Sequence, residues 1–206
     1  DRTAAVDAIM LLARSHCRRS HRSQHDSPQR HGSPLLASNT MSTRNPLPFD
    51  PIARAAEIWA ERVGPSTTMA AVTSVMRVQQ ILQSAVDNAL RPHNLTFARY
   101  EALVLLTFSK RGSLPMRVMG DRLQLHPTSV TNIVDRLEQD RLVRRMPHPT
   151  DRRTTLVEIT EDGRDLMKKA TEAVTEIDFG LRGITERQTQ QLTELLGKVR
   201  HAAGDF

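Results

Sequence analysis

The feature that most constrains the fold is an amphipathic helix followed at once by a basic β-hairpin, within residues 126–163. Apolar residues recur at helical spacing from Val130 to Leu137, so one face of this helix is expected to pack on a core. The opposite face carries short hydrogen-bonding side chains and one cation: Thr128, Ser129, Thr131, Asn132 and Arg136. A helix of this kind suits the major groove of DNA, which admits one helix and is read through base edges.

The hairpin that follows is predicted to have strands over Leu142–Met146 and Thr154–Ile159. Its loop contains Asp151, Arg152 and Arg153, and two prolines restrict the loop backbone. Asp151 is placed to brace a guanidinium. Arginines gather around the hairpin, at positions Arg141, Arg144, Arg145, Arg152 and Arg153. A basic hairpin directly after a polar-faced helix predicts a winged helix-turn-helix.

The preceding segment, Met116–Leu125, completes this motif as the first of its two helices. A short turn leads into Pro127, which is expected at the first position of the second helix, where its missing N–H costs nothing. Two helices joined in this way form the helix-turn-helix geometry. The alternative is a small α+β domain with a solvated polar face, which the basic hairpin tip disfavours. His126 and His148 are interpreted either as phosphate or base-edge contacts or as ordinary surface histidines.

The stretch LQLHPTSVTNIVDRLEQDRLVRRMPHPTDRRTTLVEITEDG resembles the DNA-binding core of the MarR family of bacterial transcriptional regulators. The family pattern Asp-x-Arg, a strand, then Leu/Ile-Thr-x-x-Gly, corresponds to residues 151–153 and 159–163, and the resemblance runs from about Thr67 to His201. It implies an obligate homodimer, usually a repressor, whose operator affinity falls when a small molecule binds. It also implies that Arg153 enters the minor groove and that Asp151 holds it.

The polar helix face and the wing together give the expected DNA-binding residues: Pro127, Thr128, Ser129, Thr131, Asn132, Arg136, Arg145, Asp151, Arg152 and Arg153. The net charge of +6 agrees with a polyanionic partner. Residues 1–40 hold six arginines and three aspartates, so half of this surplus lies outside the expected fold. The DNA-binding surface must therefore be a local basic patch.

The expected fold class is mainly α (α+β), with a winged helix-turn-helix core and N- and C-terminal helices that form a two-fold dimer interface. Long helices on both sides of the core carry apolar stripes that the core is too small to cover, and a second copy would cover them. A monomeric bundle packed on itself is the alternative. The expected domains are a disordered or non-native extension (1–49), N-terminal helices for dimerisation and a ligand pocket (50–111), the winged core (112–160) and C-terminal dimerisation helices (161–206).

Capping residues and breakers set the expected element boundaries. These are a helix capped by Asp50, a helix over Met69–Leu90, a helix from Thr96 to about Lys110, a third wing strand at Ser113–Pro115, a helix from Thr160 to about Leu181 that Gly183 breaks, and a last helix that opens on the capping box at Thr185.

Residues 1–49 are rich in Arg, His, Ser and Pro, and Met41 resembles a natural start, so residues 1–40 are interpreted as vector-derived or as a misplaced upstream start. The sequence contains no run of about eighteen apolar residues, so it predicts no membrane span. The lone Cys17 excludes an intramolecular disulfide and suits a reducing cytoplasm, where a nucleoid-associated regulator would act.

Trp59 is the single tryptophan and lies on an extra N-terminal helix. This helix resembles that of the urate-responsive branch of the family, in which a tryptophan lines the ligand pocket. That branch's acidic residue aligns with Glu101, but its arginine aligns with Asn132, which argues against urate itself. Trp59 and Glu101 are the expected ligand-binding residues. The alternative is that Trp59 only pins its helix to the dimer.

Enzymatic chemistry has little support, because the sequence contains no Gly-rich phosphate loop and no Gly-x-Ser-x-Gly elbow. No cofactor or metal is expected, and Glu57, Glu61 and Glu101 are expected to be solvated. The favoured function is a homodimeric repressor that a small aromatic or anionic ligand releases from an inverted-repeat operator in double-stranded DNA. The alternatives are a ligand-independent activator or architectural protein, and a winged-helix protein-interaction adaptor.

Overall fold

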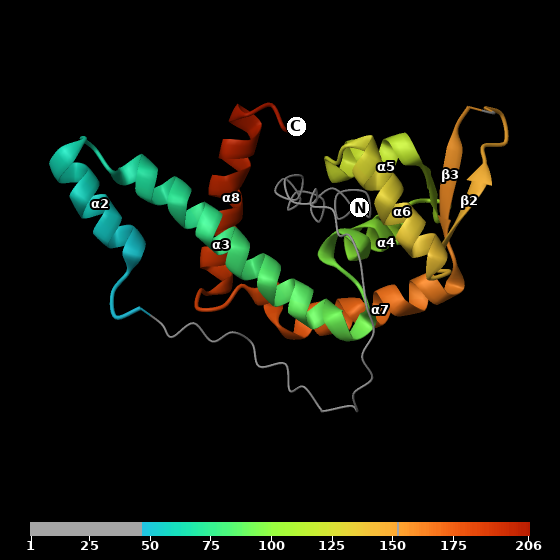
Figure 1. The fold of residues 1–206 in the computed structure, drawn as a ribbon, viewed down its shortest axis with the longest axis horizontal. Coiled ribbons are helices and arrows are strands. Elements are labelled where there is room, and N and C mark those ends of the chain that lie inside the picture. Colours follow the sequence, from blue (N-terminus) through green and yellow to red (C-terminus); the bar gives the residue numbers. More distant parts are fainter. Residues whose placement is uncertain (1–46, 152) are drawn as a thin grey trace, which may run out of the picture. The chain divides into compact units, whose positions relative to one another are not determined.

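The structure, a computed structural model, describes residues 47–151 and 153–206 (Figure 1). The expectations for residues 1–46 and for Arg152 fall outside the described residues. The helices are α2 (Pro51–Arg62), α3 (Thr67–Leu90), α4 (Phe97–Phe108), α5 (Met116–Leu123), α6 (Pro127–Gln139), α7 (Glu161–Glu176) and α8 (Glu186–Ala202), with short 3₁₀ turns η1 (Arg91–His93) and η2 (Asp178–Gly180). The strands are β1 (Ser113–Pro115), β2 (Val143–Pro147) and β3 (Thr155–Ile159). The predicted mainly α fold with a winged helix-turn-helix core is confirmed.

The described residues form two units, residues 47–78 and 79–206. In the first unit, the Asp50 carboxylate accepts a hydrogen bond from the Ile52 N–H at 2.8 Å, and Pro51 is the first residue of α2. The predicted cap of this helix is therefore confirmed. No residue of α2 is buried, so its packing surface is open in a single chain.

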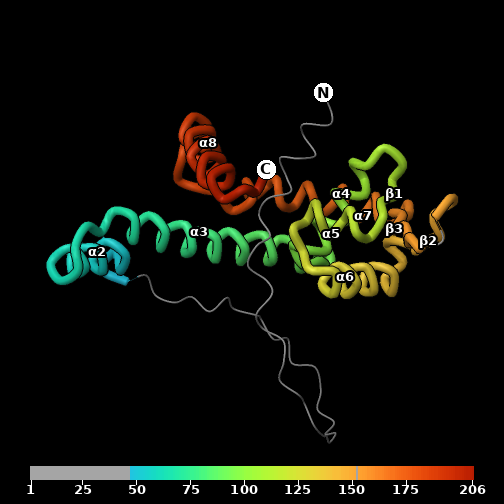
Figure 2. The backbone as a smooth tube through the Cα atoms, turned by 90° about the horizontal axis from the view of Figure 1, so that it is seen from above, coloured from blue at the N-terminus to red at the C-terminus, as the bar shows by residue number. Residues whose placement is uncertain are grey.

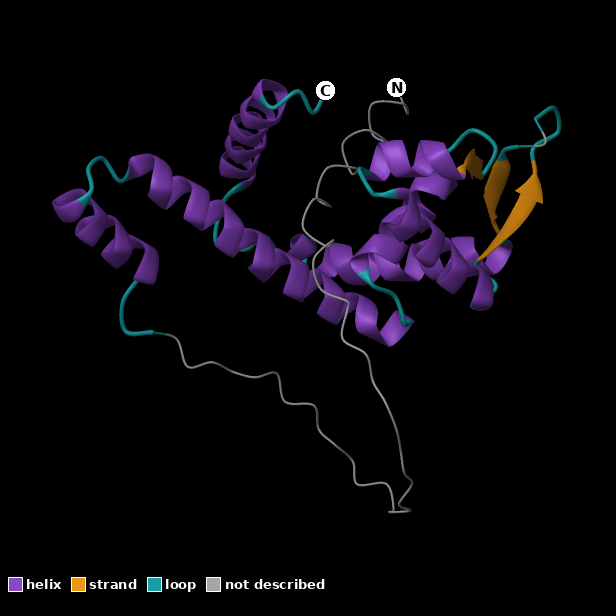
Figure 3. Cartoon of the chain, turned by 45° about the horizontal axis from the view of Figure 1, so that its top comes forward, coloured by secondary structure: helices purple, strands orange, loops and turns teal. Residues whose placement is uncertain are grey.

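The second unit is built around α4, which is buried at every position from Tyr100 to Leu106. Helices α5, α6 and α7 and strands β1 and β3 all pack against it (Figure 3). The Thr96 side chain caps α4 as predicted, by accepting from the Arg99 N–H. Asp87 of α3 accepts from the Phe97 N–H at 3.0 Å and so ties the two helices together. The helices α5 and α6 and the sheet of the winged motif are therefore held together by packing against α4.

Helices α5 and α6 form the predicted helix-turn-helix and lie against each other (Figure 2). Helix α5 ends at Leu123, earlier than the predicted Leu125, because Gln124 takes a left-handed conformation with φ of 53°. Helix α6 begins at Pro127, as predicted. The buried residues of α6 are Val130, Val134 and Leu137, which confirms the predicted apolar face.

Three strands of the described residues form an antiparallel sheet in the order β1-β3-β2. In its register Ser113 pairs with Glu158 and Arg145 pairs with Val157, which confirms the predicted third strand. The sheet leaves one edge of β2 without a strand neighbour.

The junction between the wing and α7 explains the glycine of the Ile-Thr-x-x-Gly pattern. The Thr160 side chain caps α7 by accepting from the Gly163 N–H at 3.1 Å, and its hydroxyl also lies 2.9 Å from the Arg141 carbonyl oxygen. A Cβ on Gly163 would lie 2.2 Å from the Leu142 carbonyl oxygen. Only a residue without a side chain lets the helix approach the hairpin this closely.

The predicted end of α7 is wrong. The helix stops at Glu176, before the predicted Leu181, because Asp178, Phe179 and Gly180 all take left-handed conformations. Gly180 allows close packing there, since a Cβ on it would lie 2.7 Å from the Ala85 side chain. The capping box at Thr185 is confirmed, and α8 follows it without a buried residue. No described helix is long and apolar enough to cross a membrane.

Candidate nucleic-acid interface

The outward face of α6 carries the predicted polar residues. Thr128, Thr131 and Asn132 are exposed, whereas Ser129 lies half-buried at the side of the helix. The Thr131 hydroxyl donates to the carbonyl oxygen of Pro127 at 3.0 Å, which fixes its direction along the helix. Arg136 is exposed and donates to Gln139 at 3.2 Å. This face can present hydrogen-bonding groups to base edges without unfolding.

An imidazole caps the N-terminus of α6. The His126 Nδ1 accepts a hydrogen bond from the Thr128 N–H at 3.3 Å. A neutral imidazole that accepts at Nδ1 carries its proton on Nε2, so the exposed edge of His126 is a donor. The residue therefore both ends the turn and places a donor beside the polar face.

The wing loop is closed by Asp151. Its carboxylate accepts from the Thr154 hydroxyl at 2.6 Å and from the Arg153 backbone N–H at 3.0 Å. These two bonds hold the pKa of Asp151 below its usual value. Asp151 therefore orders the loop through the backbone of Arg153. The Arg153 side chain is exposed and has no ion pair with another described residue, so it is available to a ligand outside the chain.

His148 supports the same loop from its other side. Its Nδ1 accepts from the backbone N–H of Asp151 at 3.2 Å and lies 3.4 Å from the Thr150 N. The sequence pattern did not suggest this role, although a histidine that precedes a tight turn by two or three residues has the reach of a side-chain cap.

Arg145 is already paired with two acidic residues of α6. Its guanidinium is bound by the carboxylates of Asp135 and Glu138 on α6, and the neighbouring Arg144 pairs with Glu158 across the hairpin. The spacing of Asp135 and Glu138 by three residues on one helix was the signal for this arrangement, because it places both carboxylates on one face.

The two residues predicted to bind an effector lie in different units, which the structure describes separately. Trp59, in the first unit, is 41% exposed. Glu101, in the second, is only 3% exposed, so the expectation that it is solvated is wrong, while Glu57 and Glu61 are exposed as expected. Neither carboxyl oxygen of Glu101 has a hydrogen-bond partner in residues 47–151 and 153–206, and burial raises the pKa of Glu101 to about 8. A continuous apolar run after Glu101 was the sequence signal for its burial.

Within the part of the chain that the structure describes, no group of three or more His, Cys, Asp or Glu side chains could hold a metal ion.

Comparisons with known proteins identify a family whose members are similar to this chain. The profile of the MarR family matches residues 98–155. The HTH-type transcriptional regulator MhqR of Bacillus subtilis (strain 168) is 31% identical over 131 residues, which span 63% of this chain and 89% of that protein. The crystal structure of Sco5413, a MarR family transcriptional regulator from Streptomyces coelicolor, is 51% identical, with a TM-score of 0.63 over 68% of this chain and 97% of that one. CouR from Rhodococcus jostii RHA1, solved bound to p-coumaroyl-CoA, is 30% identical, with a TM-score of 0.54 over 61% of this chain and 87% of that one.

Proposed function

The chain belongs to the MarR family of DNA-binding transcriptional regulators, and from this premise we propose that it is a homodimeric repressor released from an inverted-repeat operator by a small aromatic or anionic ligand. The observation that carries the proposal is the exposed polar face of α6 beside an ordered wing loop, whose Arg153 is exposed and forms no ion pair with another described residue. As a repressor of bacterial genes it would act in the cytoplasm, on the nucleoid, and it would need no catalytic step.

In this proposal α6 lies in the major groove. Thr128, Thr131 and Asn132 contact base edges there, with Ser129 and Arg136 at the margins of the helix. Pro127 sets the start of the helix at the DNA surface. Arg153 and its neighbour Arg152 reach the flanking minor groove, whose negative potential is strongest where it is narrow. The support is that the described members of this set, apart from half-buried Ser129, are exposed on one helix and one loop.

Dimerisation is supported by apolar side chains that a single chain leaves exposed. On α8 these are Leu195, Leu196 and Val199, and on α3 they include Val72, Val75 and Met76. Apolar patches of this kind mark interaction surfaces. The occupant we propose is a second copy of the chain, because a two-fold dimer matches a two-fold operator.

Trp59 and Glu101, each taken by itself, are proposed as effector-binding residues. A carboxyl whose pKa is raised to about 8 is largely neutral near pH 7, so it does not repel an anion and can donate a hydrogen bond to one. Its lack of a hydrogen-bond partner among the described residues supports a role in binding a polar group. The relative CouR, which was solved with p-coumaroyl-CoA, supports an effector that is both aromatic and anionic.

The test is to pass genomic fragments over the purified protein, sequence those that are retained, and screen aromatic carboxylates and phenols for release. We expect a small set of fragments that share an inverted repeat, and compounds that release them while changing Trp59 fluorescence. Fragments retained without any shared sequence would favour an architectural protein. A failure to retain DNA at low salt would favour an adaptor and reject the proposal.

A further inference from the structure

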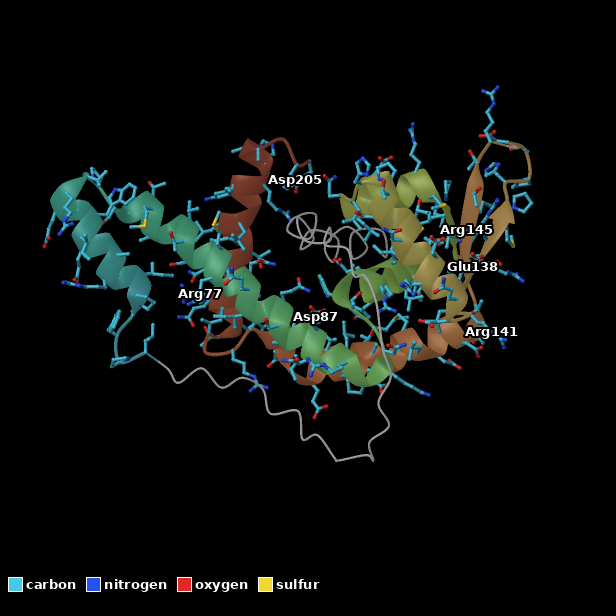
Figure 4. The ribbon with its side chains drawn as sticks, in the orientation of Figure 1. Arg77, Asp87, Glu138, Arg141, Arg145 and Asp205 are labelled. Atoms are coloured by element: carbon cyan, nitrogen blue, oxygen red, sulfur yellow. The ribbon has the colours of Figure 1, made fainter. Side chains whose placement is uncertain are left out.

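A cluster of three charged residues joins the wing to α6, which is the recognition helix in the proposed function. Arg145 on β2 donates from its guanidinium to Asp135 at 2.5 Å and to Glu138, both on α6. Arg145 and Glu138 are labelled in Figure 4. Glu138 also accepts from the backbone N–H of Arg145 at 2.8 Å. One residue of the wing is thus fastened to the helix by its main chain and its side chain together. We call Asp135, Glu138 and Arg145 the clamp.

The backbone bond matters because of where β2 lies. This strand pairs with β3 on one side only, so a row of its N–H groups has no strand partner. Glu138 occupies one of those donors. Its pKa is lowered chiefly by that backbone N–H, and then by the guanidinium. The Glu138 carboxylate is therefore ionised at neutral pH and can accept both hydrogen bonds.

The guanidinium is committed to the clamp in the same way. Partial burial works against its charge, but the hydrogen bonds that it donates to Asp135 and Glu138 raise the pKa of Arg145 above its usual value. Two carboxylates surround one cation, so the clamp has a formal charge of −1. Such a group has no net attraction for a phosphate.

We propose that Arg145 is a positioning residue and that the clamp fixes the wing, and with it Arg153, relative to the recognition helix. The expectation that Arg145 itself binds DNA is replaced by this role. The proposal rests on the proposed DNA-binding function of α6 and the wing. Arg153 can reach a groove that flanks the one holding α6 only when the angle between the hairpin and the helix is fixed. Among the described residues, the ion pairs of the clamp are the only ones that join the edge of β2 to α6.

A positioning role and a phosphate-contact role for Arg145 predict opposite changes in DNA affinity for one pair of variants. Asp135→Asn and Glu138→Gln each remove a negative charge near the DNA-binding face and loosen the hold on Arg145. If Arg145 binds phosphate, both variants should bind DNA as well as the wild type or more tightly. If Arg145 positions the wing, both should bind more weakly despite the more favourable charge.

The experiment measures operator affinity by fluorescence anisotropy for the full chain with Asp135→Asn, Glu138→Gln or Arg145→Lys. The matched control is Glu158→Gln, which breaks the Arg144 pair within the same hairpin without touching α6. We expect the clamp variants to lose about tenfold in affinity and the control to change by less than about twofold. Clamp variants that bind as tightly as the wild type, or more tightly, would overturn the proposal.

A double-mutant cycle gives a readout that simple destabilisation would not move. Arg153→Ala is placed in the wild-type and in the Glu138→Gln background. If the clamp positions Arg153, Arg153→Ala should lower DNA affinity about tenfold in the wild-type background but only about twofold in the Glu138→Gln background. Equal losses in both backgrounds would contradict the positioning role.

Hydrogen exchange tests the clamp without DNA. Exchange of the β2 amides should speed up in Glu138→Gln relative to Glu158→Gln, while the amides of α4 keep their wild-type rates. Unchanged exchange in β2 would reject the clamp even if the variants bound DNA poorly. A wild-type protein that binds no DNA, with a clamp intact by exchange, would instead reject the proposed function.

Discussion

Helix α4 buries every side chain from Tyr100 to Leu106, whereas α8 buries none of its residues, although both carry apolar side chains. The difference lies in what surrounds them. Helix α4 is covered by α5, α6, α7 and the sheet of its own chain. On α8 the side chains of Leu195 and Val199 stay 60% and 67% exposed. The continuous apolar run of α4 is therefore covered within its own chain, and we interpret the exposed apolar stripe of α8 as a surface that contacts a second copy.

The largest effect is expected from breaking that surface. Leu192→Asp with Leu196→Asp places two charges on the apolar stripe of α8 and should abolish dimerisation, so the protein becomes monomeric or misfolded and loses operator binding. Light scattering after size exclusion measures the mass. Gln190→Asp, on the opposite face of α8, is the control and should remain a dimer. A wild-type monomer that binds DNA would contradict the interpretation of α8.

The covered helix has its own test, in the pH dependence of stability. The Glu101 carboxyl has its pKa raised by burial from 4.5 to about 8, so between these values the folded state holds a proton that the unfolded state releases. Its contribution is therefore fully present below pH 4.5 and is lost as the pH rises through about 8. The slope attributable to it is at most about 1.4 kcal/mol per pH unit.

Glu101→Gln removes this titration, so its free energy of unfolding relative to the wild type should rise between pH 5 and pH 9, as a rough range set by the two pKa values. Urea unfolding at several pH values measures it. Glu57→Gln, an exposed glutamate on α2, should show no such trend. A constant difference between wild type and Glu101→Gln across this range would show that Glu101 titrates normally.

A smaller loss is expected at the wing. Arg153→Ala should weaken binding to all DNA sites by about tenfold and make the salt dependence shallower by about one unit per subunit. Titrations between roughly 50 and 200 mM salt measure both quantities. Arg187→Ala, an exposed arginine of α8, should leave the salt slope unchanged. The same slope for wild type and Arg153→Ala would remove the wing from the mechanism.

The smallest effect concerns the cap of α6. His126→Ala removes the acceptor for the Thr128 N–H and should lower stability by about 1 kcal/mol, as for other helix caps. His126→Asn keeps a short acceptor at the same position and should recover most of that loss. Thermal unfolding of the two variants measures the difference, and equal destabilisation by both would show that the Nδ1 bond contributes little.

Much of the fold follows from local signals in the sequence. Asp50, Thr96, Thr160 and Thr185 all cap helices where their spacing from the following residues predicts it, because a cap depends on only a few neighbouring atoms. The hairpin was likewise predicted from its basic loop and the two prolines that restrict it, and the third strand was predicted at Ser113–Pro115.

Features that depend on distant contacts were not predictable in this way. The early end of α7 depends on Gly180 packing against Ala85, far away in the sequence. The apolar run after Glu101 indicates that α4 is buried, but the burial of the carboxyl itself depends on the elements that pack against α4. Arg145 counted as one of several arginines until the structure placed Asp135 and Glu138 against it. Charge counts locate a basic hairpin, but only geometry tells which of its cations are already paired.

The most direct measurement of the central claim is selection of random DNA by the wild type and by Asn132→Ala, followed by sequencing. The account predicts that the wild type selects an inverted repeat with half-site centres about ten base pairs apart. It also predicts that Asn132→Ala selects the same spacing with preference relaxed by about 1–3 kcal/mol at one or two positions in each half-site. Identical selected sequences for both proteins, or no repeat at all for the wild type, would contradict the claim that α6 reads DNA.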